Sequence, residues 1–81
     1  MKLYRVEGGV ARIPVLGLVG ITKEQFPRYA PVIETVHKTD DRYVVRALQE
    51  LEFEAGEVIG LTAEPTGALA EVLVEVGGEA P

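Results

Sequence analysis

Hydrophobic and polar residues alternate most clearly between residues 43 and 54, and this period of two predicts a β-strand. Its apolar face is broken only by Gln49 and consists of Tyr43, Val45, Ala47, Leu51 and Phe53. The polar positions, which are expected to point outward, are Arg46, Glu50, Glu52 and Glu54. The residues 39–42 have the composition of a turn. The strand at 43–53 is therefore expected to form a hairpin with a strand at 32–38.

The first residues of the chain have a less regular pattern. Residues 2–6 are predicted as a short strand that ends at Gly8-Gly9, and residues 10–19 as a second extended run. Pro14 has no amide proton for a sheet, so this second run must lie at an edge or contain a break. Residues 13–21 are apolar on both faces. Either the rest of the fold or a neighbouring subunit must therefore cover them.

The segment 22–31 contains two prolines and two aromatic residues. Residues 22–26 are predicted as one helical turn with Thr22 as its cap. Pro27 and Pro31 are expected to keep residues 28–30 from continuing as a helix. Phe26 and Tyr29 are then large apolar groups in a loop. They serve either as lids on the core or as contacts to a partner.

The last third of the chain allows two interpretations. Ala55-Gly56 is expected to turn the chain into a strand at 57–63. Residues 62–76 then form either a helix or, as the pattern favours, a β-turn at 64–67 followed by a strand at 69–76. In the strand version the alternating valines, which are Val72, Val74 and Val76, point inward. Residues 77–81 are expected to end this strand.

The composition predicts one small, mainly β domain over residues 1–81, with an extended apolar segment and loop at 1–31 and a β core at 32–78. A core this small is thin unless something assists it. The chain has no cysteine and one histidine, which removes disulfides and structural zinc. Association with copies of itself is the remaining means of support. The absence of serine and asparagine is typical of proteins from thermophiles, although genome composition produces the same bias.

Charge is divided unevenly along the sequence. All eight Lys and Arg residues lie at or before Arg46, and the five acids there leave a net charge of 8 − 5 = +3. The remaining eight acids, all glutamate, lie after it without a base and give −8. The two halves either form solvated faces by chance or make one basic and one acidic surface that suits a charged partner.

No pattern of catalytic or cofactor-binding residues is present. Without serine there is no Ser-His-Asp chemistry, and His37 stands alone. Gly8-Gly9 and Gly77-Gly78 lack the strand–loop–helix context of a phosphate loop. The row Glu50, Glu52 and Glu54 indicates an acidic ridge rather than a cation site. We therefore expect no enzyme activity, no cofactor, no metal and no small-molecule substrate.

Nucleic acid and membranes are not expected partners. The chain has no basic cluster with interleaved aromatic residues. Its longest uncharged stretch, 13–22, is far shorter than a membrane span, and residues 1–6 do not form a signal peptide. A cytoplasmic protein, or one in a particle assembled there, is expected. Contacts with proteins are expected at Ile13, Val15, Leu16, Leu18, Phe26, Tyr29, Glu50, Glu52 and Glu54.

Residues 43–78 resemble the small head-decoration, or cement, proteins of tailed bacteriophages. The resemblance rests on Arg46-Ala47-Leu48, on the run at 54–62, on a polar turn at 64–67 and on the valine-rich run at 71–77. It implies a compact β-tulip or β-barrel that forms trimers and binds a coat protein on the outside of a capsid. The N-terminal segment would clamp neighbouring coat subunits, and the location would be the virion surface. Residues 20–31 do not match the pattern.

Two other resemblances imply other functions. The pattern from Phe53 to Leu61 is also similar to small SH3-like phage proteins of the head–tail junction or tail, in which the last segment is a helix. Residues 9–14 faintly resemble the start of swapped-hairpin transcription regulators and antitoxins. Those DNA-binding proteins have basic residues after the proline, where this chain has Val15-Leu16-Gly17-Leu18.

Overall fold

The computed structural model describes residues 1–39 and 41–78 and confirms a mainly β fold. The strands are β1 (Lys2–Val6), β2 (Ala11–Ile13), β3 (Leu18–Thr22), β4 (Ile33–Lys38), β5 (Arg42–Ala47), β6 (Leu51–Phe53), β7 (Val58–Leu61) and β8 (Leu73–Gly78). The helices are α1 (Phe26–Tyr29), the 3₁₀ turn η1 (Ala30–Val32) and α2 (Gly67–Glu71). No helix in the described part of the chain is long and apolar enough to span a membrane.

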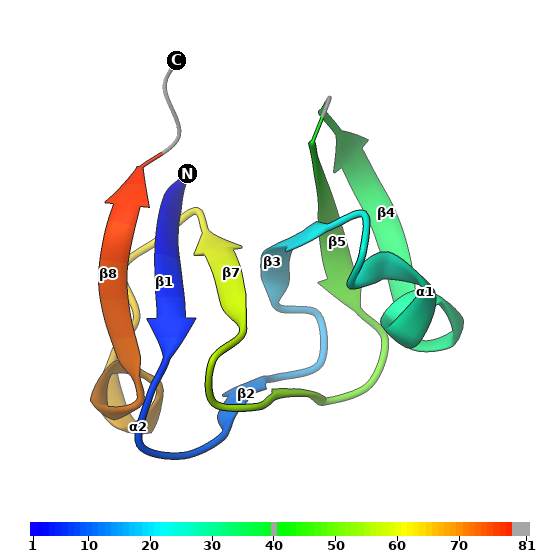
Figure 1. Cartoon of the computed structure of the whole chain (residues 1–81). Coiled ribbons are helices and arrows are strands. Elements are labelled where there is room, and N and C mark those ends of the chain that lie inside the picture. The colour runs from blue at the N-terminus through cyan, green and yellow to red at the C-terminus, as the bar shows by residue number, and fades with distance from the viewer. Residues whose placement is uncertain (40, 79–81) are drawn as a thin grey trace.

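Six strands form one antiparallel sheet in the order β4-β5-β3-β7-β1-β8. Figure 1 shows two groups of three strands that lean apart, with β8, β1 and β7 on one side and β3, β5 and β4 on the other. The two groups are joined where β3 meets β7, at the single pair Gly20–Gly60. Below them β2 and β6 pair with each other as a separate two-stranded sheet that closes one end.

The fold consists of two equivalent halves related by a pseudo-twofold axis. Residues 2–38 and residues 42–78 each contain the same succession of three strands, a helix and a fourth strand. Exchanging the halves turns the sheet order β4-β5-β3-β7-β1-β8 into its own reverse. The axis passes through two residue pairs, Gly20–Gly60 and Arg12–Glu52. In each pair the two partners lie 40 positions apart in the sequence.

The register of the strands confirms this symmetry residue by residue. A shift of 41 positions carries β1 onto β5, and a shift of 40 carries β3 onto β7 and β4 onto β8. The backbone bond from Leu16 N to Ala47 O then corresponds to the bond from Gly56 N to Val6 O, at 2.7 and 2.8 Å. Both outer strands also shift register at equivalent places, at residue 36 in β4 and residue 76 in β8.

The halves are interleaved rather than side by side. β5 of the second half lies between β4 and β3 of the first, and β1 of the first half lies between β7 and β8 of the second. Residues 1–31, expected as an extended segment beside a β core, thus contribute three strands to that core. Each half obtains its sheet hydrogen bonds largely from the other half.

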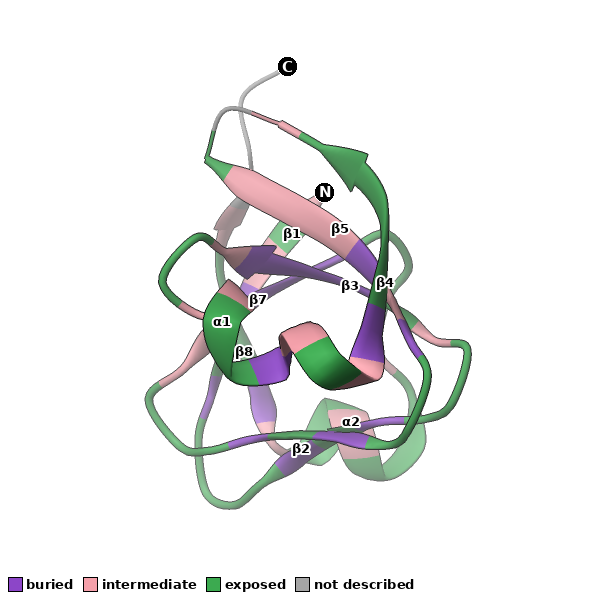
Figure 2. Cartoon of the chain, turned by 90° about the vertical axis from the view of Figure 1, so that its right-hand side faces the viewer, coloured by how far each residue is buried: buried purple, intermediate pink, exposed green. Residues whose placement is uncertain are grey.

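One hydrophobic core lies between the two groups of strands. It is built from both halves and contains Tyr4, Val6, Ala11, Ile13, Val19, Ile21, Tyr29, Ile33, Val45, Ala47, Leu51, Phe53, Ile59, Leu61 and Leu73. The apolar face predicted for residues 43–53 is confirmed, because Val45, Ala47, Leu51 and Phe53 are buried. In Figure 2 burial follows β3, β7 and β2, whereas β4 is buried only where it begins.

Two expectations about individual elements were wrong, and one is confirmed. The strand at 43–53 is interrupted after Ala47, and β6 leaves the main sheet to pair with β2. The prolines do not prevent a helix at 26–32: Pro27 and Pro31 occupy first-turn positions of α1 and η1, where a missing amide proton removes no hydrogen bond. The break expected at Pro14 is confirmed, since β2 ends at Ile13.

The last third contains both a helix and a strand, but no hairpin. β8 pairs with β1 instead of β7, so α2 carries the chain across β1 to the far side. The expectation that alternating valines point inward was wrong for Val74 and Val76, which are exposed, whereas Val72 packs partly buried against the core. The buried residue of β8 is Leu73. The strand continues through Gly78, and residues 79–81 lie outside the described residues.

Candidate protein-interaction surface

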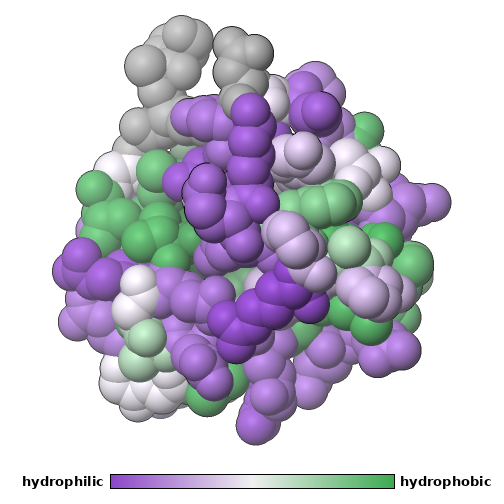
Figure 3. Space-filling model, turned by 45° about the vertical axis from the view of Figure 1, so that its right-hand side comes forward, coloured by the Kyte–Doolittle hydropathy of each residue, from purple (hydrophilic) through white to green (hydrophobic). Residues whose placement is uncertain are grey.

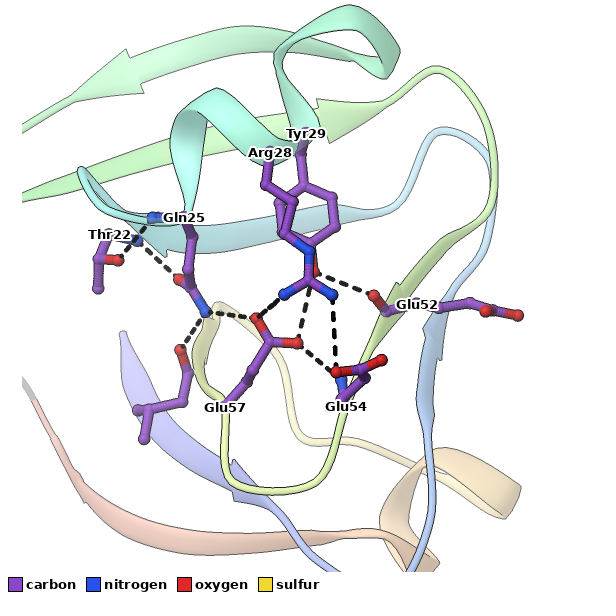
Figure 4. Close-up of polar contacts among 8 residues, drawn as sticks. Thr22, Gln25, Arg28, Tyr29, Glu52, Glu54 and Glu57 are labelled. Atoms are coloured by element: carbon purple, nitrogen blue, oxygen red, sulfur yellow. Dashed lines mark hydrogen bonds and ion pairs between the residues drawn. The ribbon is translucent and has the colours of Figure 1, made fainter.

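Two equivalent grooves each lie between the helix of one half and the turn before the third strand of the other half, and the groove at α1, called here the groove of the first half, is filled. Tyr29 on α1 enters it, packs on Phe53 with ring centroids 4.8 Å apart, and donates a hydrogen bond to the carbonyl oxygen of Glu52 at 3.1 Å. Glu57 lies beside the Tyr29 hydroxyl, with both carboxylate oxygens 3.4 Å from it. Figure 4 shows these side chains converging from α1 and from the turn before β7.

Glu57 is the centre of this polar cluster. Its carboxylate accepts a hydrogen bond from the backbone N–H of Glu54 at 2.7 Å and lies 3.5 Å from Arg28. Gln25 contacts Glu57 at 3.4 Å and the carbonyl of Val58 at 3.2 Å. Gln25 is itself held by reciprocal bonds with Thr22, whose hydroxyl accepts its N–H, in the manner of a capping box. The cluster therefore ties α1 to the turn before β7.

The pKa of Tyr29 is raised to about 12, first because the buried phenol loses solvation and then because the Glu57 carboxylate repels a phenolate. A tyrosine with this pKa stays protonated at neutral pH and acts here as a hydrogen-bond donor. The cluster thus has a structural role in closing the groove.

The equivalent groove of the second half is open. The equivalent of Tyr29 is Leu69, because each lies three residues before the valine whose carbonyl accepts the matching backbone bond. The other members of the cluster are also replaced by smaller or less polar residues: Gln25 by Pro65, Arg28 by Ala68, Glu54 by Pro14 and Glu57 by Gly17. These replacements remove the side chains that fill the first groove.

A hollow of about 470 Å³ results. One wall comes from residues 12–18 and the other from residues 61–69, and the lining is Arg12, Ile13, Pro14, Gly17, Leu18, Leu61, Thr62, Ala63, Glu64, Pro65, Thr66 and Leu69. A second hollow of about 280 Å³ adjoins it, since both are lined by Arg12 and Leu69. Apolar groups dominate the lining of the larger hollow, with Arg12 on one wall and Glu64 on the other.

Exposed apolar side chains border this hollow. The turn between its wall residues Pro14 and Gly17 carries Val15 and Leu16, which are 57% and 65% exposed. Leu18, in the hollow's wall, is 39% exposed. On the face drawn in Figure 3, hydrophobic residues gather in patches separated by hydrophilic ones. We call the hollow together with Val15, Leu16 and Leu18 the apolar face.

Leu16 has an unusual backbone conformation. Its φ is 70°, and among the described residues it is the only one with positive φ that is not a glycine. The equivalent residue in the other half is Gly56, with φ 95°. A left-handed conformation costs an L-residue roughly 1–2 kcal/mol. A leucine at this position stays 65% exposed within its own chain, so burial offsets only part of this cost.

The structure separates the apolar residues predicted as contacts into two groups. Val15, Leu16 and Leu18 are exposed together on the apolar face. Ile13 and Tyr29 lie in the core, and Phe26 is half-buried with its ring 4.5 Å from that of Tyr43. Tyr29 therefore lies on the core as a lid, and Phe26 packs against the core from its half-exposed position; a contact of Phe26 with a partner stays a prediction. The apolar run 13–21 is covered at Ile13, Val19 and Ile21 and uncovered at Val15, Leu16 and Leu18.

The acidic candidates are exposed but partly neutralised within the chain. Glu52 pairs with Arg12 at 3.1 Å and Glu54 with Arg28 at 3.7 Å, while Glu50 precedes β6. Lys2 lies 3.8 Å from both Glu64 and Glu75. Bases of the first half thus meet acids of the second. Part of the charge that is uneven along the sequence is therefore paired in contacts between the halves.

In residues 1–39 and 41–78, no group of three or more His, Asp or Glu side chains is placed to hold a metal ion. His37 is exposed on β4.

The sequence analysis missed Arg12, Leu61 and Leu69, which belong to the hollow. The sequence signal that could have indicated them is the internal repeat, in which Val19-Gly20-Ile21-Thr22 recurs as Ile59-Gly60-Leu61-Thr62 at a spacing of 40.

Comparisons with protein-family models, curated proteins and solved structures found no match to this chain.

Proposed function

We propose that this chain is a non-enzymatic structural protein that acts by binding other proteins through its apolar face. The observation that carries the proposal is Leu16, a large apolar side chain that is 65% exposed at a backbone position favouring glycine. Strain of this kind persists where the residue has a purpose outside local folding. A contact with another protein would bury Leu16, and the hydrophobic free energy gained would offset the cost of its backbone conformation.

The particle proposed is a tailed-phage capsid, on which the chain would serve as a decoration protein bound to the coat. The support comes from the resemblance of residues 43–78 and from an apolar face on a small domain. The hairpin implied by that resemblance is not formed, because β8 pairs with β1. The apolar face, rather than the hairpin, is therefore the basis for this proposal.

Co-sedimentation with assembled coat-protein shells tests this function. Wild-type protein is expected to pellet with shells, and Leu16→Gly is expected to remain in the supernatant. Leu48→Gln is a matched control, because Leu48 is also half-exposed but lies outside the apolar face. Wild-type protein that stays in the supernatant at all concentrations would refute the decoration role.

The interleaving of the two halves favours a second candidate, a regulator of the swapped-hairpin class. The name of that class refers to exchanged hairpins, and here the single strands β1 and β5 are exchanged between the halves of one chain. The net charge of −5 and the pairing of Arg12 with Glu52 oppose binding to phosphates. Sequence-specific DNA binding at physiological salt, measured by fluorescence anisotropy, would favour this candidate over the structural one.

A further inference from the structure

The apolar face contains a projection and a hollow side by side. Val15 and Leu16 project from the turn whose two ends, Pro14 and Gly17, form part of the wall of the hollow. The equivalent place across the pseudo-twofold axis has neither feature: its turn carries Ala55 and Gly56, and its groove is filled by Tyr29. Both departures from symmetry therefore occur at one place, which indicates that they serve one contact.

We infer that the apolar face binds a second copy of this chain in a twofold dimer, with Leu16 of each copy in the hollow of the other. A surface that has both a projection and an adjoining hollow is complementary to itself when turned about a twofold axis. The inference uses the proposed function only in taking the apolar face as a protein contact.

The charges around the hollow fit this arrangement. Arg12 is on one wall and Glu64 is on the opposite wall. Each already has an ion-pair partner in its own chain, Glu52 at 3.1 Å and Lys2 at 3.8 Å, but both side chains remain more than half exposed. A twofold axis that runs along the hollow, between its two walls, places the Arg12 wall of one copy against the Glu64 wall of the other, so that opposite charges meet. A rim of one sign would repel itself in the same arrangement.

The sheet edges are the competing surface, and the structure disfavours them. β4 and β8 end the six-stranded sheet and expose Val36, Val74 and Val76. Each edge strand, however, has a register shift at its equivalent position, residue 36 or residue 76. Irregularities of this kind twist an edge away from pairing with another strand.

Sedimentation equilibrium of the purified chain, over a range of concentrations, tests the inference with three variants. Wild type is expected at twice the chain mass of 8.8 kDa. Leu16→Gly is expected to weaken the dimer by at least about tenfold, as loss of a central anchor does. It should remain folded, because Gly56 occupies the equivalent position with positive φ. Leu69→Tyr, which copies Tyr29, should fill the hollow and weaken the dimer likewise.

Val74→Thr on the edge strand β8 is the control and is expected to leave the dimer intact. The inference is overturned by a wild-type protein that is monomeric or trimeric, by a dimer that survives Leu16→Gly, or by one that is lost in Val74→Thr. A monomeric wild type that still pellets with coat shells would overturn the dimer and leave the proposed function standing. A dimer that never pellets with shells would refute the proposed function and leave the dimer standing.

Discussion

Leu16 and Gly56 occupy equivalent positions of the two halves, and both have positive φ, at 70° and 95°. Each donates its backbone N–H to the strand of the opposite half, Leu16 to Ala47 and Gly56 to Val6. The turn thus has an equivalent backbone conformation in both halves. It carries a leucine side chain in the first half and no side chain in the second. The difference allows the strain at Leu16 to be measured against a reference within the same molecule.

Leu16→Gly is expected to leave the monomer at least as stable as wild type, and more stable by up to about 1 kcal/mol. The change relieves a left-handed leucine, although glycine's greater freedom in the unfolded chain offsets part of the gain. Urea unfolding at low protein concentration measures the effect. The reverse change, Gly56→Leu, should destabilise by about 1–2 kcal/mol. A Leu16→Gly variant less stable than wild type would contradict this account.

Stability is expected to fall as the pH rises from about 10 to 12, in part because of Tyr29. Its pKa is about 12 in the folded protein against an ordinary 10, so the unfolded chain releases this proton first. The free-energy contribution is complete below pH 10 and lost as pH approaches 12. Tyr29→Phe should show a weaker decline in unfolding free energy over this range. An unchanged decline would show that other groups cause it.

Glu57→Ala is expected to destabilise the fold by about 1–3 kcal/mol, because it leaves the N–H of Glu54 without its acceptor and removes the charge beside Arg28. The Glu57 side chain is only 17% exposed, so water replaces it incompletely. Urea unfolding provides the measurement. Glu50→Ala, at an exposed position of the same segment, should change stability by less than about 0.5 kcal/mol. Equal effects of the two substitutions would contradict the role of the cluster.

A chain divided in the loop between β4 and β5 should fold only by association. In fragments 1–40 and 41–81 the first strand of each has lost the partners that the other half supplies. Each fragment is expected to be unfolded as a monomer, and an equimolar mixture should regain the circular dichroism spectrum of the intact chain. Sedimentation would identify self-paired fragments. A fragment that is folded while monomeric would contradict the interleaving.

Local features of this fold were predictable from the sequence. Alternation at 43–53, the turn composition at 39–42 and the break at Pro14 each depend on neighbouring residues, and the structure confirms all three. The pairing of β1 with β8 and of β5 with β3 was not predictable in this way, because it depends on strands from the other half. The inward residue of β8 was also missed, since Leu73 rather than the valine series faces the core.

The candidate site was predictable only in part. The pattern singled out residues 13–21 as apolar on both faces, but which of them are exposed depends on where β2 ends and the turn begins. Val15 and Leu16 are exposed because the turn at 14–17 separates β2 from β3. The opposite wall of the hollow comes from residues 61–69, about 50 positions away, and no local pattern links the two.

The two grooves also bear on why both halves reside in one polypeptide. An assembly of two identical 40-residue chains would have to carry the same groove twice, either closed on both sides or open on both. In a single chain the two equivalent positions can differ, so that Tyr29 closes one groove while Leu69 leaves the other open.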